Sequence, residues 1–198
     1  MASAGSALGP VAVLIPVKAF GVAKVRLAPA LDPGQRAALA RHMADQVVAA
    51  ARPLPVAVVC DDAEVAGWAR SHGAIVIHEP GKGLNRAVED GVAWLAAAHV
   101  EQVIVAHGDL PFATELAWLA RFPEVTLVPD RREDGTNVAC VPAAAGFQFA
   151  YGPGSFARHA VEARRLGMGL RIVREPSLGW DVDLPGDLVA AVGSDRWP

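Results

Sequence analysis

The sequence predicts an α/β fold in which a doubly wound, mostly parallel sheet is covered by helices on both faces. Short runs of β-branched and other apolar residues alternate with longer segments whose apolar residues recur at helical spacing. The runs are apolar throughout and the connections are short, which is typical of parallel strands buried on both faces. We treat all 198 residues as one domain and expect residues 1–10 to form a flexible N-terminal extension.

The composition excludes several classes of protein. With 53% hydrophobic and 20% charged residues and a mean hydropathy of +0.29, the chain is too apolar to be disordered. The formal net charge is -3 and the basic residues are scattered, so we expect no nucleic acid and no membrane as partner. The apolar run over residues 11–15 is too short for a signal peptide or a membrane span. Cys60 and Cys140 fit neither a metal knuckle nor a disulfide framework, which favours a cytoplasmic location.

The first strand and the first helix have the clearest local signals. Residues 11–17 form a short β-branched run bounded by polar residues, as in a strand buried on both faces. Asp32 supplies an N-cap and Pro33 a first-turn proline for an amphipathic helix over residues 34–52, which prolines then end.

The following segment repeats the strand and helix alternation. Asp62 precedes the second expected helix as a capping residue, and Gly73 ends that helix. Strands are expected over residues 56–60, 74–77, 100–106 and 125–128, and helices over residues 63–72, 84–98 and 112–122.

The pattern changes after Pro129. A charged loop over residues 130–135 is followed by two expected strands, residues 136–141 and 147–150, with no helix between them. This indicates an antiparallel addition to the sheet. A helix from Ser155 to about residue 166, a strand over residues 170–173, a loop over residues 180–187 and a C-terminal helix complete the prediction.

Ligands of such sheets bind at the carboxyl ends of the strands, so the residues after each strand are the candidates for a site. Lys18, Lys24 and Arg26 lie on the loop that leaves the first strand and could wrap an anion such as a triphosphate. With Gly21 as its one glycine, the loop is neither a Walker loop nor a dinucleotide fingerprint. An ordinary solvated loop explains the same charges.

Carboxylates follow two further apolar or extended segments. Asp109 comes directly after the expected strand 100–106 and its His-Gly pair, and Asp181 and Asp183 project to the same side of an extended stretch. Converging carboxylates can hold Mg²⁺, which shares the rest of its shell with phosphates and water. The alternative for Asp109 is a helix cap, because Asp before Leu-Pro often begins a helix.

Two turns combine glycine with a hydroxyl. Thr136 follows Asp134-Gly135, and Ser155 follows Gly152-Pro153-Gly154 at a helix start, so both could present hydroxyl and backbone N–H donors to one small anion. A tight turn and an N-cap are the alternative explanations. No histidine forms a nucleophile motif, and we interpret His107 as a structural or supporting residue.

These segments together resemble one family over about residues 11–192. Six short motifs occur in its order, namely residues 15–18, 23–28, 108–111, 129–131 with 134–137, 151–156 and 181–185. The sequence resembles the phospholactate/phosphoenolpyruvate guanylyltransferases of coenzyme F-420 biosynthesis. The resemblance implies a nucleotidyltransferase fold akin to glycosyltransferase-A domains, with GTP and Mg²⁺ as co-reactants and pyrophosphate as product.

The resemblance also assigns residues to roles. It implies that Asp109 and Asp183 bind the metal and, with Lys24, form the catalytic set. The contacts with phosphoenolpyruvate fall on Thr136, Gly152 and Ser155, and those with the nucleotide on Lys18, Lys24, Arg26, Gly83 and Asn85. Two protein partners are compatible with this reaction: a second copy of the chain, in a homodimer, and a downstream transferase that takes up the product.

The chemistry is consistent with these residue types. A phosphate monoester has a second pKa near 6, so it is mostly a dianion at neutral pH and can attack a nucleotide without a general base. The alternatives are another nucleotidyltransferase or a nucleotide-sugar glycosyltransferase of the same fold, and a catalytically silent nucleotide-binding domain. Retention of Asp109 and Asp183 argues against the silent domain. The sequence does not decide which phosphorylated acid is the substrate: phosphoenolpyruvate, 2-phospholactate or 3-phosphoglycerate.

Overall fold

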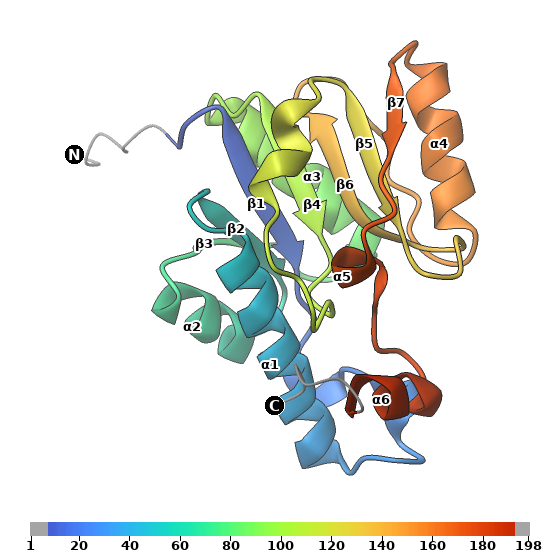
Figure 1. Cartoon of the computed structure of the whole chain (residues 1–198). Helices are drawn as coiled ribbons and strands as arrows, with labels where there is room; N and C mark the ends of the chain where they lie inside the picture. Colours follow the sequence, from blue (N-terminus) through green and yellow to red (C-terminus); the bar gives the residue numbers. More distant parts are fainter. Residues whose placement is uncertain (1–7, 193–198) are drawn as a thin grey trace, which may run out of the picture.

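The computed structural model describes residues 8–192, which form a twisted sheet with helices on both sides (Figure 1). The sheet has seven strands in the order β3-β2-β1-β4-β6-β5-β7. The strands are β1 (Val11–Pro16), β2 (Val56–Cys60), β3 (Ile75–His78), β4 (Gln102–Ala106), β5 (Val125–Pro129), β6 (Thr136–Pro142) and β7 (Leu170–Ile172).

The helices lie in the connections between strands. The α-helices are α1 (Pro33–Ala50), α2 (Ala63–Ser71), α3 (Gly83–Ala97), α4 (Ser155–Arg165), α5 (Pro176–Gly179) and α6 (Pro185–Val192). The 3-10 turns are η1 (Phe20–Val22), η2 (Val25–Leu27) and η3 (Ala117–Arg121). Among the described residues, no helix has the length and apolar character needed to cross a membrane.

All the strands point the same way except β6. The pairs of β1 with β2 and β4, of β2 with β3, and of β5 with β7 are parallel, whereas β6 runs antiparallel between β4 and β5. In the central register, Leu14 lies beside Ala57 on one side and Val105 on the other. The expected antiparallel addition after Pro129 is therefore confirmed, and it is inserted inside the sheet.

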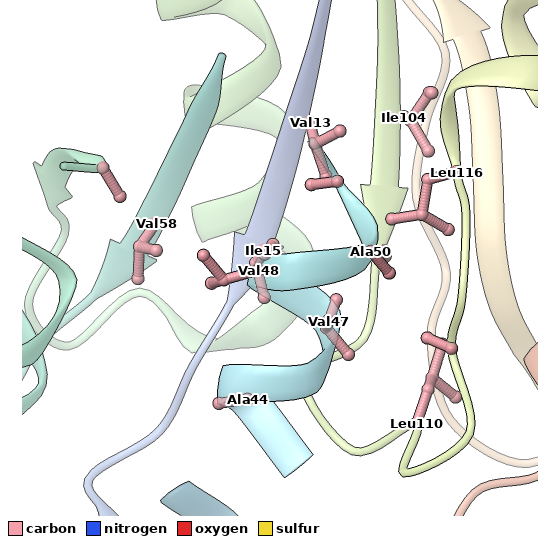
Figure 2. Packing of buried hydrophobic residues seen from close by; sticks show 14 of the residues in the cluster. Val13, Ile15, Ala44, Val47, Val48, Ala50, Val58, Ile104, Leu110 and Leu116 are labelled. Atoms are coloured by element: carbon pink, nitrogen blue, oxygen red, sulfur yellow. The ribbon is translucent and has the colours of Figure 1, made fainter. Parts of the chain in front are cut away.

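Both faces of the central strand are buried, as the uninterrupted apolar runs predict. Val13 and Ile15 face α1 and α2, and Figure 2 shows them packed beside side chains of α1 such as Val47. The alternate residues of β1, Ala12 and Leu14, face α3 in a second core cluster, in which Leu14 approaches Gly91. Since side chains alternate along a strand, only a strand covered on both sides can be apolar at every position.

The start of α1 confirms the capping prediction. The side chain of Asp32 accepts a hydrogen bond from Gln35 N, and the Gln35 side chain accepts one in return from Asp32 N, each at 2.9 Å. This reciprocal capping box, with Pro33 in the first turn, fixes the beginning of the helix. The end of the long loop that leads into α1 is thereby held in place.

The helix expected over residues 112–122 is a wrong prediction. Only the five-residue 3-10 turn η3 forms there. The N–H of Leu116 donates at 3.0 Å to the carbonyl of Ala50, at the end of α1, so it cannot close a helical turn of its own segment. Burial of Leu110, Leu116 and Leu119 against the α1 face of the sheet decides the path of the chain.

The strand expected over residues 147–150 is also wrong. The described chain has no strand over these residues, and a turn in which Gly146 has a φ of 67° separates them from β6. Backbone N–H groups of this segment are bonded to side chains of α3 and α4 instead. The short helix α5 lies between the expected strand 170–173 and the expected loop 180–187. No helix was predicted there.

The carboxyl ends of the parallel strands lie at one edge of the sheet, toward the bottom of Figure 1, where the loop carrying η1 and η2 lies beside α6. Leu27 and Met43 pack there against Val182 and Leu188, so the first loop and the C-terminal segment form one wall. Of the expected N-terminal extension, residues 1–7 lie outside the described residues, and the Pro10 carbonyl is bonded to the amides of Glu101 and Gln102.

Candidate active site

A cavity of about 660 Å³ opens at the carboxyl ends of the strands. Its volume is in the range of small-molecule sites. Its wall combines segments that are far apart in the sequence: the loop after β1, the ends of β2 and β4, the β5–β6 loop, the start of α4 and the stretch before α6. The predicted site residues that line it are Lys18, Lys24, Arg26, Gly83, Asp109, Thr136, Gly152, Ser155 and Asp183.

One group of the lining residues, which we call the charged end, is joined by ion pairs. Lys24 Nζ lies 2.6 Å from Asp109 Oδ2 and 2.9 Å from Asp183 Oδ1, so one ammonium group bridges the two carboxylates. Arg26 Nη1 is 3.6 Å from Asp183 Oδ2, with most of its side chain in solvent. The backbone of Lys24 has a φ of 55°, a left-handed conformation that is uncommon for a residue with a side chain. The two ion pairs hold the lysine there.

The electrostatics of this end follow from burial and proximity. Burial by itself favours the neutral amine, but Asp109 and Asp183 raise the pKa of Lys24 above its ordinary value. Burial opposes the charge of Asp109 as well, yet Lys24 holds the pKa of that carboxyl below its usual range. Burial and the neighbouring Asp109 raise the pKa of Asp181 to about 6. The acidic group Asp109, Asp181 and Asp183 thus carries an excess of negative charge over Lys24.

The structure does not support the helix-capping alternative for Asp109. Its Oδ2 is bonded to Lys24, and its Oδ1 is buried without a hydrogen-bond partner among the described residues. The next helical element along the chain is the 3-10 turn η3, which begins at Ala117. Asp109 is among the residues that line the cavity. The metal-binding role remains a prediction.

Asp183 is held in place by Asp187, a residue that the sequence analysis missed. Asp187 Oδ2 accepts hydrogen bonds from the backbone N–H groups of Asp183 at 2.9 Å and Leu184 at 2.8 Å. Its Oδ1 is bonded to Arg131 and Arg132 on the β5–β6 loop. This carboxylate therefore ties the segment that carries Asp183 to the loop that leads to Thr136. A carboxylate four residues after Asp183 was the available sequence signal.

A second group of the lining residues, which we call the hydroxyl end, consists of Thr136, Ser155 and the backbone around them. Thr136 N donates to Ser155 Oγ at 3.0 Å, which joins the start of β6 to the start of α4. Ser155 N donates to Gly152 O, so the two backbone N–H groups expected to face an anion are bonded inside the protein. The hydroxyls remain as donors. Gly152 has a φ of +120°, a conformation that only glycine adopts readily.

Asn85, a predicted nucleotide contact, and His107, interpreted as a structural or supporting residue, differ in their relation to the cavity. Asn85 does not line the cavity, and its Oδ1 accepts from Tyr151 N at 2.7 Å, which gives it a role in holding the chain before Gly152. His107 lines the cavity with its Nε2 buried and unpartnered in the described chain, beside the ring of Tyr151 at a centroid distance of 4.6 Å. Burial lowers the pKa of His107, so its ring is neutral at pH 7.

Sequence and structure comparisons identify relatives of this chain. The family described as "Guanylyl transferase CofC like" matches residues 11–194. A phosphoenolpyruvate guanylyltransferase from Sphaerobacter thermophilus is 36% identical over 189 residues, covering 91% of each chain.

Solved structures share the fold at low sequence identity. A 4-diphosphocytidyl-2C-methyl-D-erythritol synthase from Anaerococcus prevotii has a TM-score of 0.60 at 12% identity, covering 91% of this chain and 93% of its own. A glucosyl-3-phosphoglycerate synthase from Mycobacterium tuberculosis, in complex with Mg²⁺ and uridine-diphosphate, has a TM-score of 0.57 at 15% identity, covering 91% and 74%. The predicted fold, shared by nucleotidyltransferases and sugar transferases, is confirmed.

Proposed function

The chain belongs to the family of guanylyl transferases like CofC, and on that premise we propose that it transfers GMP from GTP to the phosphate of phosphoenolpyruvate, releasing pyrophosphate. The family supplies the reaction class, and the acid is the one named for the relative from Sphaerobacter thermophilus. The reaction belongs to coenzyme F-420 biosynthesis in the cytoplasm. Both cysteines are free, in line with a reducing compartment.

The observation that carries this proposal is that one cavity is lined by two unlike groups of residues, the charged end and the hydroxyl end. The end with Lys18, Lys24 and Arg26 offers the cations that a triphosphate needs. The end with Thr136 and Ser155 offers neutral donors suited to a second, smaller anion. A cavity with these two ends can hold both reactants side by side, so that one can attack the other.

The acidic residues fit a magnesium ion. Asp109 and Asp183 are close enough to share a single cation, since Lys24 contacts both, and Asp109 Oδ1 is a buried oxygen without a partner in the described chain. Within residues 8–192 no three potential metal-binding side chains gather at one point. Two carboxylates from the protein, with phosphates and water completing the shell, suit Mg²⁺.

Asp109 and Asp183 would hold the ion, and when bound it would neutralise charge that develops on the phosphates during transfer. The residues of the chain supply the rest. Lys18, Lys24 and Arg26 orient the triphosphate and disperse the charge of the departing pyrophosphate. The acid attacks as a phosphate dianion, which needs no general base.

The test is acid-dependent release of pyrophosphate from GTP. The purified protein is incubated with Mg²⁺, one nucleotide and one acid at a time, with phosphoenolpyruvate, 2-phospholactate or 3-phosphoglycerate as the acid. We expect release with GTP and phosphoenolpyruvate, and at least about tenfold less with CTP. The downstream transferase that takes up the product is added in a parallel series, in case the product accumulates poorly. Release that is equal with CTP, or that does not require an acid, would contradict the proposal.

A further inference from the structure

The chain between Phe147 and Gly152 is held by side chains rather than by a neighbouring strand. Four consecutive backbone N–H groups, from Gln148 to Tyr151, each donate to a side chain of α3 or α4. The acceptors are Glu162 Oε1, Glu89 Oε1, His159 Nε2 and Asn85 Oδ1, in that order. His159 is the one acceptor in this set that also contacts a predicted ligand-binding residue.

His159 lies between the backbone and Thr136. Its Nε2 is 2.9 Å from Ala150 N, and its Nδ1 is 3.0 Å from Thr136 Oγ1. A backbone N–H can only donate, so Nε2 must be the unprotonated acceptor. In a neutral ring the proton then lies on Nδ1, which donates to Thr136 Oγ1. The side chain is fully buried, and burial with the charge of Arg158 lowers the pKa of His159 to about 4, so the neutral form holds at pH 7.

These hydrogen bonds determine which way the hydroxyl protons of Thr136 and Ser155 can point. Thr136 Oγ1 accepts from His159, and Ser155 Oγ accepts from Thr136 N. Neither hydroxyl has an acceptor for its own proton among the described residues, and both residues line the cavity. We propose that His159 is a positioning residue that makes the Thr136 hydroxyl a hydrogen-bond donor to the phosphorylated acid.

The inference deepens the proposed function and rests on it. A hydroxyl can accept or donate, and without a fixed partner it spends part of its time pointed away from an anion. Since both hydroxyls accept from inside the protein, they present donors and favour a ligand group that is wholly an acceptor. The carboxylates of Asp130 and Asp134, which also line the cavity, accept hydrogen bonds from backbone N–H groups of their loop and of Gly154. A phosphate dianion or a carboxylate is wholly an acceptor, whereas a protonated acid or an alcohol is not.

The first experiment is a double-mutant cycle on acid binding. Phosphoenolpyruvate is titrated by calorimetry into the protein with Mg²⁺ and a non-hydrolysable GTP analogue, for wild type, His159→Leu, Thr136→Val and the double variant. We expect about tenfold weaker binding for His159→Leu and about ten- to a hundredfold for Thr136→Val. If His159 acts through the Thr136 hydroxyl, adding His159→Leu to Thr136→Val weakens binding by less than about twofold.

Two further variants separate positioning from packing. His159→Asn keeps an N–H near the position of Nδ1 and is expected to recover most of the loss. Glu162→Ala removes the acceptor for Gln148 N from the same helix without touching Thr136. It should leave acid affinity within about twofold of wild type. Independent effects of His159→Leu and Thr136→Val, or an equal loss in Glu162→Ala, would overturn the inference. Wild-type protein that binds the analogue but no acid would instead contradict the proposed function.

The second experiment needs only wild-type protein for its readout. Long-range proton–nitrogen NMR correlations distinguish the two neutral tautomers of histidine, and the His159 signals are assigned by their absence from His159→Asn. We expect a protonated Nδ1 and an unprotonated Nε2 at pH 7. A protonated Nε2, or a doubly protonated ring, would overturn the inference even if His159→Leu failed to fold.

Discussion

Different interactions hold the residues of the charged end and those of the hydroxyl end in place. At one end, ion pairs connect Lys24 to carboxylates 85 and 159 residues away in the sequence. At the other, uncharged hydrogen bonds connect Thr136 to Ser155 and His159, 19 and 23 residues away. Both ends lie at the carboxyl edge of the same sheet.

The difference indicates how each end can select its ligand. Coulombic attraction acts over several ångströms and tolerates small shifts, so the charged end suits a flexible triphosphate with a metal ion. Hydrogen bonds between neutral groups require short distances and a defined direction, so the hydroxyl end suits a small rigid acid. Substitutions at the two ends should therefore have effects that differ in kind as well as in size.

The largest effect is expected from the carboxylates. Asp109→Asn and Asp183→Asn each keep the shape of the side chain but lose the charge that pairs with Lys24 and that would bind Mg²⁺. Turnover, measured as initial pyrophosphate release with GTP and phosphoenolpyruvate, should fall by about 10²–10³-fold. Asp90→Asn is the matched control, because Asp90 pairs with Lys82 on the surface and should leave turnover within about twofold. Near-normal turnover of Asp109→Asn would mean that Asp109 has a structural role and does not bind the metal.

A smaller effect, on the KM of one substrate at a time, is expected when a single residue of either end is replaced. Lys24→Ala should raise the KM for GTP by about ten- to a hundredfold, because its charge is assigned to the triphosphate. Ser155→Ala should raise the KM for the acid by a similar factor and leave that for GTP within about threefold. Each KM is measured with the other substrate saturating. A Ser155→Ala enzyme whose main defect lies in GTP binding would reverse the placement of the two ends.

The smallest effect concerns stability and pH. Because burial and Arg158 hold the pKa of His159 at about 4 in the folded protein, while an unfolded histidine titrates near 6.5, the unfolded state binds more protons between these values. Folding stability should thus fall as the pH drops from 7 to 5, with His159 contributing about 2 kcal/mol to that fall. The nearby Glu162 opposes this shift, and His107 adds to it.

Denaturant unfolding at both pH values tests this prediction. His159→Leu removes the titrating group, so its loss of stability between pH 7 and pH 5 should be about 2 kcal/mol smaller than that of wild type. Lys24 and Asp109 keep their charges over this range. Asp181, with its pKa raised to about 6, titrates in both proteins, so its contribution cancels in the comparison. Equal losses in the two proteins would mean that His159 is already protonated at pH 7 or is not buried in solution.

The sequence predicted the N-terminal half of the fold more accurately than the C-terminal half. In the first half, caps such as Asp32 and Asp62 and uninterrupted apolar strands such as residues 56–60 are local signals, and the structure follows them closely. After Ala106 the chain is governed by distant contacts. The Ala50 carbonyl breaks the helix expected near Leu116, and four helix side chains replace a strand partner for residues 148–151.

By itself the sequence determined the α/β class, the strands of the central sheet, the family, and the set of residues at the strand ends. Apolar periodicity and short motifs can be recognised in the sequence alone, because they depend on the order of residues along the chain. Only the tertiary structure decided which of those residues meet. Lys24 between Asp109 and Asp183, Asp187 behind Asp183, and His159 behind Thr136 are contacts between distant segments. Such contacts depend on the register and packing of the folded sheet, which no short stretch of sequence encodes.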